Sequence, residues 1–174
     1  MRCAYTAGIL TALVENKVFF DYVCGISAGS SSALNYLSRD TKRIKYAFVD
    51  VASDPAIGGA ASMARGKGFF NAEYLYGPNA RSGPVPFDWE AFSANPGRLR
   101  IQAFERDTGR SVTWTREDMP DLDSALVRVR ASSTLPGSCR PSRSTARRWS
   151  TAAWAPTAAC RCISPRPTAS RSSW

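Results

Sequence analysis

The chain has 174 residues, 44% of them hydrophobic, and a formal net charge of +9. This length suits one domain with a buried core, and no apolar run approaches the length needed to span a bilayer. The charge is unevenly placed, because residues 138–174 hold seven arginines and no acidic residue and so carry +7 of it. Residues 1–137 keep only +2, which weakens the usual argument that a basic protein binds nucleic acid.

The first fifty residues alternate between helical and extended patterns. Helices are expected over residues 4–15, 28–38 and 41–49, and a buried strand over residues 18–24. The first apolar segment is similar to the core of a signal peptide, but Glu15-Asn16-Lys17 follows instead of a small-residue cleavage pattern. A helix is therefore favoured there, and the alternation predicts an α/β protein.

The middle of the chain is expected to be less regular. Residues 52–68 are rich in Gly, Ala and Ser and predict a mobile loop, whereas residues 71–76 predict one helical turn. Prolines and glycines predict irregular backbone over residues 77–86, and a short helix is expected over residues 88–93.

The last predicted elements are a hairpin and a helix. Residues 98–106 and 110–115 alternate apolar and polar side chains around Asp107-Thr108-Gly109, which predicts two antiparallel strands. Asp123 is predicted to cap a helix that runs to Ser133 and stops before Leu135-Pro136-Gly137.

The segment Gly25-Ile26-Ser27-Ala28-Gly29 joins the predicted strand to the second helix. A sharp turn of this kind lifts a serine hydroxyl above the sheet, and small flanking residues are needed because a Cβ atom would clash there. Ser27 is therefore the candidate nucleophile, and the alternative is a glycine-rich turn without chemistry. Because the chain has no histidine, the base that activates Ser27 must be a carboxylate or a lysine.

The five cysteines form neither a metal-site spacing nor an even disulfide framework; they are Cys3, Cys24, Cys139, Cys160 and Cys162. Cys160 and Cys162 are separated by one residue and have no partner histidines, which argues against zinc. We therefore expect no metal, no cofactor and a reducing, cytoplasmic location.

Three segments resemble the bacterial patatin-like phospholipases: residues 1–8, the Gly25–Gly29 turn and Ala131-Ser132-Ser133-Thr134-Leu135-Pro136. The resemblance covers residues 1–137. It implies a three-layer α/β/α sandwich with a mostly parallel central sheet, incomplete in this chain. It also implies hydrolysis of lipid acyl esters by a serine-aspartate dyad without histidine. The implied partners are a lipid or acyl-ester substrate and a peripheral membrane contact, with the oligomeric state left open.

The resemblance also assigns residue roles. It makes Ser27 the nucleophile within the elbow formed by Gly25, Ile26, Ala28 and Gly29, with the Ala28 backbone N–H as an oxyanion donor. Arg2 matches the arginine of the family's glycine-rich oxyanion loop, but Cys3 stands where glycine is usual and the glycine run is absent. We therefore expect the chain to begin at an internal methionine, after the loss of a central strand.

The catalytic aspartate is the second departure from the family, because no Asp-Gly-Gly follows residue 137. Residues 138–174 are rich in Arg, Ser and Ala, and a disordered tail that binds acidic partners is one explanation. A frameshift is the favoured one. If codons there mostly end in G or C, a shifted frame restores Asp-Gly-Gly, with the aspartate codon straddling Ser150 and Thr151. We accordingly expect this chain to be inactive.

Other candidate bases have simpler structural roles. Four carboxylates lie nearest in sequence to the region where the catalytic aspartate is expected: Asp107, Asp118, Asp121 and Asp123. They suit turns, loops and a helix cap. Lys42 and Lys45 suit a solvated helix face. Two alternative functions stay open: a non-catalytic lipid-binding remnant, and nucleic-acid binding through the basic tail. Aromatic residues are too sparse in that tail to favour specific nucleic-acid recognition.

Overall fold

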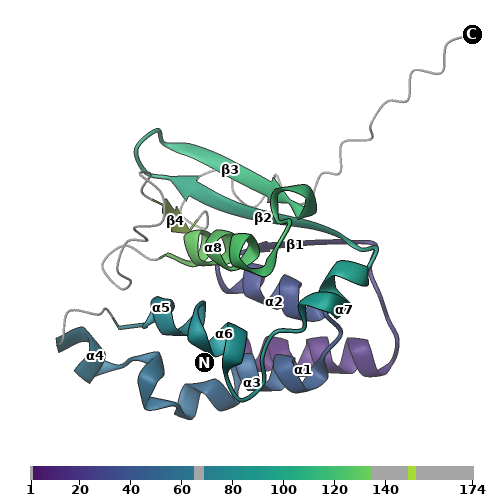
Figure 1. Ribbon diagram of the computed structural model, residues 1–174, viewed down its shortest axis with the longest axis horizontal. Coiled ribbons are helices and arrows are strands. Elements are labelled where there is room, and N and C mark those ends of the chain that lie inside the picture. Colours follow the sequence, from purple (N-terminus) through teal and green to yellow (C-terminus); the bar gives the residue numbers. More distant parts are fainter. Residues whose placement is uncertain (1, 65–68, 135–148, 152–174) are drawn as a thin grey trace, which may run out of the picture.

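The computed structural model describes residues 2–64, 69–134 and 149–151 (Figure 1). Within these residues the protein is an α/β structure, as expected, with a four-stranded sheet. Helices α2 (Ala28–Leu37) and α8 (Leu122–Ser133) pack against one face of the sheet, and α1 (Arg2–Glu15) lies beyond α2. The three-layer expectation includes a helical layer on the opposite face, and the described residues do not supply one.

Strand β2 (Arg98–Glu105) is the centre of the sheet. Strand β1 (Tyr22–Ile26) pairs with it in parallel from Tyr22↔Arg98 to Ile26↔Gln102, and β3 (Arg110–Thr115) pairs antiparallel along its other edge. Strand β4 (Trp149–Thr151) pairs antiparallel with the last three residues of β2. Since β3 already occupies the other edge of those residues, β4 lies on the β1 edge, and its last residue, Thr151, is one rung beyond the end of β1.

The N-terminal elements match the predicted alternation, with one shift. Strand β1 begins at Tyr22, four residues later than expected, and extends to Ile26. Val18, Phe19 and Phe20 precede it and keep 42%, 41% and 52% of their surface exposed. The apolar run is thus not one buried strand. Pairing with β2 starts only at Asp21, whose carbonyl accepts a hydrogen bond from the Arg98 N–H.

The segment between α3 (Thr41–Phe48) and β2 is more helical than predicted. It forms short turns, which are η1 (Asp50–Ser53), η2 (Pro55–Ile57), α4 (Ala60–Ala64), α5 (Ala72–Leu75), α6 (Pro78–Ser82) and α7 (Trp89–Ala94). The expectation of a loop over residues 52–64 and of irregular backbone over 78–82 was therefore wrong. Side chains that accept backbone N–H bonds, such as Asp54, Asn71 and Asp88, stabilise these turns locally. Pro78 is tolerated because it occupies the first turn of α6.

Helix α8 begins two residues earlier than predicted, because Asp121 caps it instead of Asp123. The Asp121 carboxylate accepts a hydrogen bond of 2.7 Å from the Ser124 N–H, and this bond lowers the pKa of Asp121. Asp123 instead pairs with Arg81 of α6 at 2.6 Å. Before α8, the turn η3 (Arg116–Asp118) is closed by the Asp118 carboxylate, which accepts from the Thr115 N–H.

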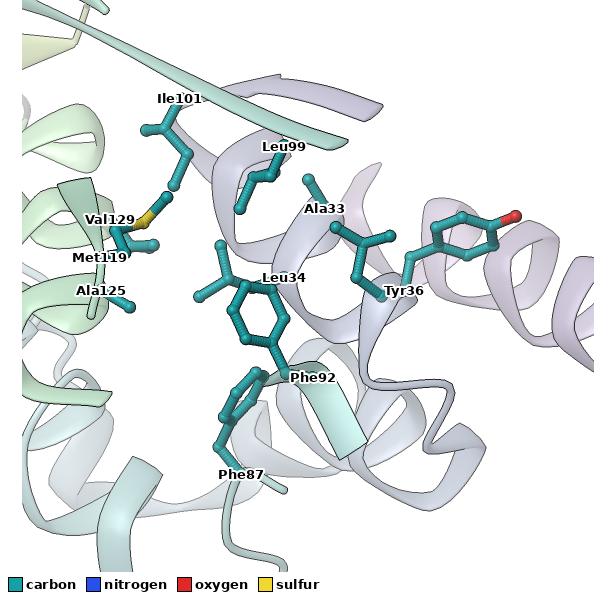
Figure 2. Close-up of a cluster of buried hydrophobic side chains, with 11 residues drawn as sticks. Ala33, Leu34, Tyr36, Phe87, Phe92, Leu99, Ile101, Met119, Ala125 and Val129 are labelled. Carbon is teal, nitrogen blue, oxygen red and sulfur yellow. The ribbon is translucent and has the colours of Figure 1, made fainter. Parts of the chain in front are cut away.

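The core lies between the sheet and the helices. Figure 2 shows Leu34 of α2 between Leu99 of β2 and Phe92 of α7, with Val129 of α8 to one side. Ile101 and Phe92 are the most deeply buried large residues of this cluster, at 0% and 1% exposure. No helix in the described part of the chain combines the length and apolarity that crossing a bilayer requires.

Ile101→Ala tests the dependence of the fold on the central strand. Truncating a fully buried isoleucine removes apolar contacts and leaves a cavity, so we expect a loss of about 2–5 kcal/mol of unfolding free energy. Ile9→Ala, on the exposed side of α1, is the matched control and is expected to change it by less than about 0.5 kcal/mol. Urea unfolding followed by circular dichroism measures both; equal effects would place the core elsewhere.

Candidate active site at the strand-to-helix turn

Ser27 adopts a backbone conformation that serine rarely takes. It has φ 56° and ψ −129°, and it stands between the last residue of β1 and the first residue of α2. A non-glycine residue at positive φ stores strain that the surrounding structure must offset. The strand, turn and helix context expected for a nucleophilic serine is therefore present. No described residue forms a hydrogen bond with the Ser27 Oγ.

Gly25 is required by close packing across the turn. A Cβ atom at Gly25 would lie 2.2 Å from the Gly29 carbonyl oxygen and 2.5 Å from the Ser30 nitrogen. Gly29 is different, because a Cβ added there would meet no atom within 4 Å. The expected steric need for small residues on both sides of Ser27 is thus met at Gly25 and not at Gly29. Ile26, the remaining residue of the turn, ends β1 opposite Gln102.

Ser132 of α8 holds the turn in place. Its Oγ accepts a hydrogen bond of 2.9 Å from the Ser27 N–H and donates one of 2.7 Å to the Gln102 carbonyl of β2. The Ser132 side chain is fully buried. One hydroxyl therefore ties together the end of β1, the middle of β2 and the end of α8. Sequence analysis matched this serine to a family segment but gave it no physical role.

Ser27 lines an apolar cavity of about 210 Å³. The first turns of α2 contribute Ala28, Ser31 and Leu34 to its wall, and α8 contributes Leu126 and Val129. Most of the other lining side chains are aliphatic or aromatic; among them are Phe48, Val51, Ile57, Phe70, Leu75 and Phe87. Such a lining suits a hydrocarbon chain more than a polar ligand.

The Ala28 N–H lies beside Ser27 at the first position of α2. Backbone N–H groups in the first turn of a helix have no acceptor within the helix, and the helix dipole favours negative charge there. Arg2 begins α1, and its neighbour Cys3 lines the same cavity as Ser27. The start of α1 and the start of α2 therefore approach one space, and the expected roles of Arg2 and Ala28 stay predictions.

Arg43 is a cavity residue that sequence analysis missed. It is only 4% exposed, it lines the cavity, and its Nη1 donates a hydrogen bond to the Val85 carbonyl. Burial lowers the pKa of its guanidinium, and the smaller effects of Tyr46 and Asp40 oppose this. Helical spacing was an available signal, because Arg43 shares one face of α3 with the apolar residues Ala47 and Phe48.

No carboxylate and no lysine of the described residues lines the cavity. Asp107 lies in the β2–β3 turn, and Asp118, Asp121 and Asp123 are engaged as described above. Lys45 pairs with Asp50 at 2.6 Å on the surface. Sequence analysis expected none of these to act as the base. Within the described ranges there is also no cluster of His, Cys, Asp or Glu that would hold a metal ion.

Strand β4 brings residues 149–151 next to the turn. Thr151 lies opposite Ala103 on β2, one rung beyond the Ile26↔Gln102 pair that ends β1. Its N–H donates to the Thr134 carbonyl at the end of α8, and both Ser150 and Thr151 are buried. These are the two positions that the shifted reading frame assigns to an aspartate. The rest of the predicted tail lies outside the described residues.

Comparison with known families agrees with these observations. The family model described as patatin-like phospholipase matches residues 1–154, which is most of the chain. The match extends past residue 137 and includes β4. No curated protein matches the chain.

Gly25→Ala and Gly29→Ala form a matched pair that tests the turn geometry. Alanine at position 25 would press against the backbone of α2, so we expect a lower unfolding free energy and a lower melting temperature. Alanine at position 29 meets open space within a helix and is expected to raise the unfolding free energy by up to about 1 kcal/mol. Thermal and urea unfolding measure both variants. Equal behaviour would contradict the close approach of Gly25 to Gly29.

Ser132→Ala tests the hydroxyl that holds the turn. Removing it leaves the Ser27 N–H and the Gln102 carbonyl without this partner, which is expected to cost about 1–3 kcal/mol of unfolding free energy. Ser32→Ala is the control, because its hydroxyl bonds only to the Ala28 carbonyl within α2. Urea unfolding decides the result: a Ser132→Ala variant as stable as Ser32→Ala would show that the bridge is unimportant.

Proposed function

Because the chain belongs to the patatin-like phospholipase family, we propose that its fold serves hydrolysis of lipid acyl esters with Ser27 as the nucleophile. The observation that carries this proposal is the position of Ser27. It stands at positive φ on a strand-to-helix turn and lines an apolar cavity. A strained turn of this kind exposes a nucleophilic hydroxyl, and the cavity provides a place for the acyl chain of the ester.

The proposed reaction is a two-step acyl transfer. The Ser27 Oγ attacks the ester carbonyl while a carboxylate takes its proton, and the C–O bond to the leaving alcohol breaks after that alcohol receives the proton. The negative charge on the carbonyl oxygen is stabilised by the Ala28 N–H at the start of α2. Water then attacks the acyl-serine while the carboxylate takes a proton from it. The bond between the acyl carbon and the Ser27 Oγ breaks as that proton passes from the carboxylate to Oγ, which releases the fatty acid and restores Ser27.

We further propose that the base belongs on β4 and that this chain lacks it. No described carboxylate lines the cavity, whereas β4 carries Ser150 and Thr151 alongside the end of β1. A frameshift that replaced an aspartate at this position accounts for both facts. Without the base Ser27 stays a weak nucleophile, and loss of one member of such a unit lowers the rate by about a million-fold in well-studied serine hydrolases.

A lipid-binding role without catalysis is the second candidate. The apolar cavity and the absence of a lining carboxylate among the described residues favour it. Met63 of α4 and Phe69 expose 60% and 45% of their surface beside the cavity residues Ile57 and Phe70. These exposed apolar side chains support the proposed peripheral contact with a lipid surface.

Restoring a carboxylate on β4 tests the proposed function. We expect the unmodified chain to hydrolyse p-nitrophenyl butyrate no faster than Ser27→Ala. Thr151→Asp or Ser150→Asp is expected to add hydrolysis that disappears again when combined with Ser27→Ala. Thr151→Asn and Ser150→Asn are the uncharged controls, and circular dichroism checks that each variant folds.

Two results would count against the proposal. Ser27-dependent turnover by the unmodified chain would show that the base is already present. Folded aspartate variants without any turnover would show that β4 is not the position of the base. Sequencing the gene through the codons for residues 135–154 tests the frameshift independently of protein folding, since it requires an inserted or deleted base there.

A further inference from the structure

The cavity at Ser27 extends along α2 to a second polar end. Its wall follows one face of that helix from Ala28 through Ser31 to Asn35, a span of about 10 Å at the helical rise. Helix α2 ends at Leu37 and α3 begins at Thr41, so the first turn of α3 lies near the C-terminal end of α2. Arg43 belongs to that turn. Ser27 and Arg43 thus lie towards opposite ends of the apolar cavity.

Arg43 is a buried cation whose charge is only partly compensated in the described part of the chain. The Asp40 carboxylate accepts a hydrogen bond from the Arg43 backbone N–H, and its charge raises the pKa of Arg43 less than burial lowers it. Among the described residues no carboxylate forms an ion pair with its guanidinium, and its Nε has no hydrogen-bond partner. A buried charge is costly unless hydrogen bonds and an opposite charge compensate it. Burial accordingly lowers the pKa of Arg43. The only acceptor of its guanidinium N–H groups given by the structure is the Val85 carbonyl.

A purely structural role explains Arg43 incompletely. The bond to Val85 and the position of its guanidinium 5.6 Å from the Tyr46 ring centroid hold the side chain in place. Neither contact neutralises the charge or occupies Nε. Asn35, 3% exposed and also in the cavity wall, has an amide oxygen without a partner in the described structure. Neither this oxygen nor the Arg43 Nε is accessible to solvent, so the feature that points to a polar ligand group is the Arg43 guanidinium itself. It is a cation in the wall of an apolar cavity, and no ion pair to it occurs among the described residues.

We propose that the Arg43 end of the cavity binds the carboxylate of an aliphatic amphiphile whose chain runs along α2 towards Ser27. The proposal rests on the proposed function only in treating this cavity as the acyl site. The same chemistry has two sources: a free fatty acid, or an acyl ester whose far end carries a carboxylate. In the second case the ester group would lie at Ser27 and the carboxylate at Arg43.

A carboxylate fits this end better than a phosphate. A guanidinium and a carboxylate are both planar, and one monoanion neutralises one cation. A phosphate monoester would bring a second negative charge that no other cavity residue matches, since Arg43 is the only cation among the lining residues described.

Titration calorimetry with the full chain tests the proposal. The probes are octanoate and octan-1-ol, which share a chain length and differ in charge. Octanoate is expected to bind at least about tenfold more tightly than octan-1-ol, because a hydrogen bond to a charged group contributes roughly 1.5–3 kcal/mol. This comparison needs no variant, and equal affinities for the two probes would overturn the proposal.

Substitutions then assign the charge preference to Arg43. Arg43→Gln removes the charge and is expected to weaken octanoate binding by about tenfold while leaving octan-1-ol unaffected. Arg43→Lys keeps a charge and is expected to restore part of the preference. Arg39→Gln is the matched control, because Arg39 is exposed and stacks on Phe19. A folded Arg43→Gln variant that still prefers octanoate would overturn the proposal.

A third probe distinguishes the two sources. Monomethyl suberate has a carboxylate at one end and an ester at the other. Tighter binding of monomethyl suberate than of octanoate identifies the carboxylated acyl ester as the ligand, and the reverse order identifies the free fatty acid. Ser27→Ala removes the proposed nucleophile, so binding of the three probes to this variant is measured without turnover. A failure of the hydrolase proposal therefore leaves this result intact.

Discussion

One buried hydroxyl organises the candidate active site. Ser132 accepts the Ser27 N–H and donates to the Gln102 carbonyl, so it joins the turn, the central strand and the end of α8. The backbone of Ser27 is strained, and strain of this kind persists only where the surroundings offset it. The glycine at position 25 completes the arrangement by letting α2 start directly above the strand. The position of Ser27 in the cavity wall depends on these contacts.

The cavity beside this turn is mainly apolar, and Arg43 is the one charged residue among its described lining residues. Its walls are the buried faces of α2, α3 and α8 and the short turns between α3 and β2. These faces would otherwise form ordinary core, and their apolar side chains suit an acyl chain for the same reason. Ser27 at one end and Arg43 towards the other are the chemically distinctive positions. A ligand with an ester group and an anionic group would meet both.

The family match and the geometry support each other at different levels. The match over residues 1–154 establishes the family, and lipid hydrolysis is supported at the level of that family. The geometry concerns individual residues: it places β4 on the edge of β2 directly beyond β1, close to the Ser27 turn. A three-residue strand with buried side chains is an unexpected feature for an arginine-rich tail. Its position is consistent with a segment that descends from part of the catalytic sheet.

The sequence by itself determined the features that depend on local spacing. The strand-to-helix turn at Ser27, the β2–β3 hairpin, helices α2 and α3 and the short helices α5 and α7 follow from short patterns. Helix α8 was also expected, but with Asp123 as its cap instead of Asp121. The sequence did not predict the other short turns over residues 50–82, whose caps are individually weak signals, or the start of β1, which pairing with β2 decides. Only the tertiary structure decided that Ser132 and β4 meet Ser27 and that Arg43 enters the cavity. These contacts join segments distant in the chain, and their geometry is set by packing rather than by local sequence.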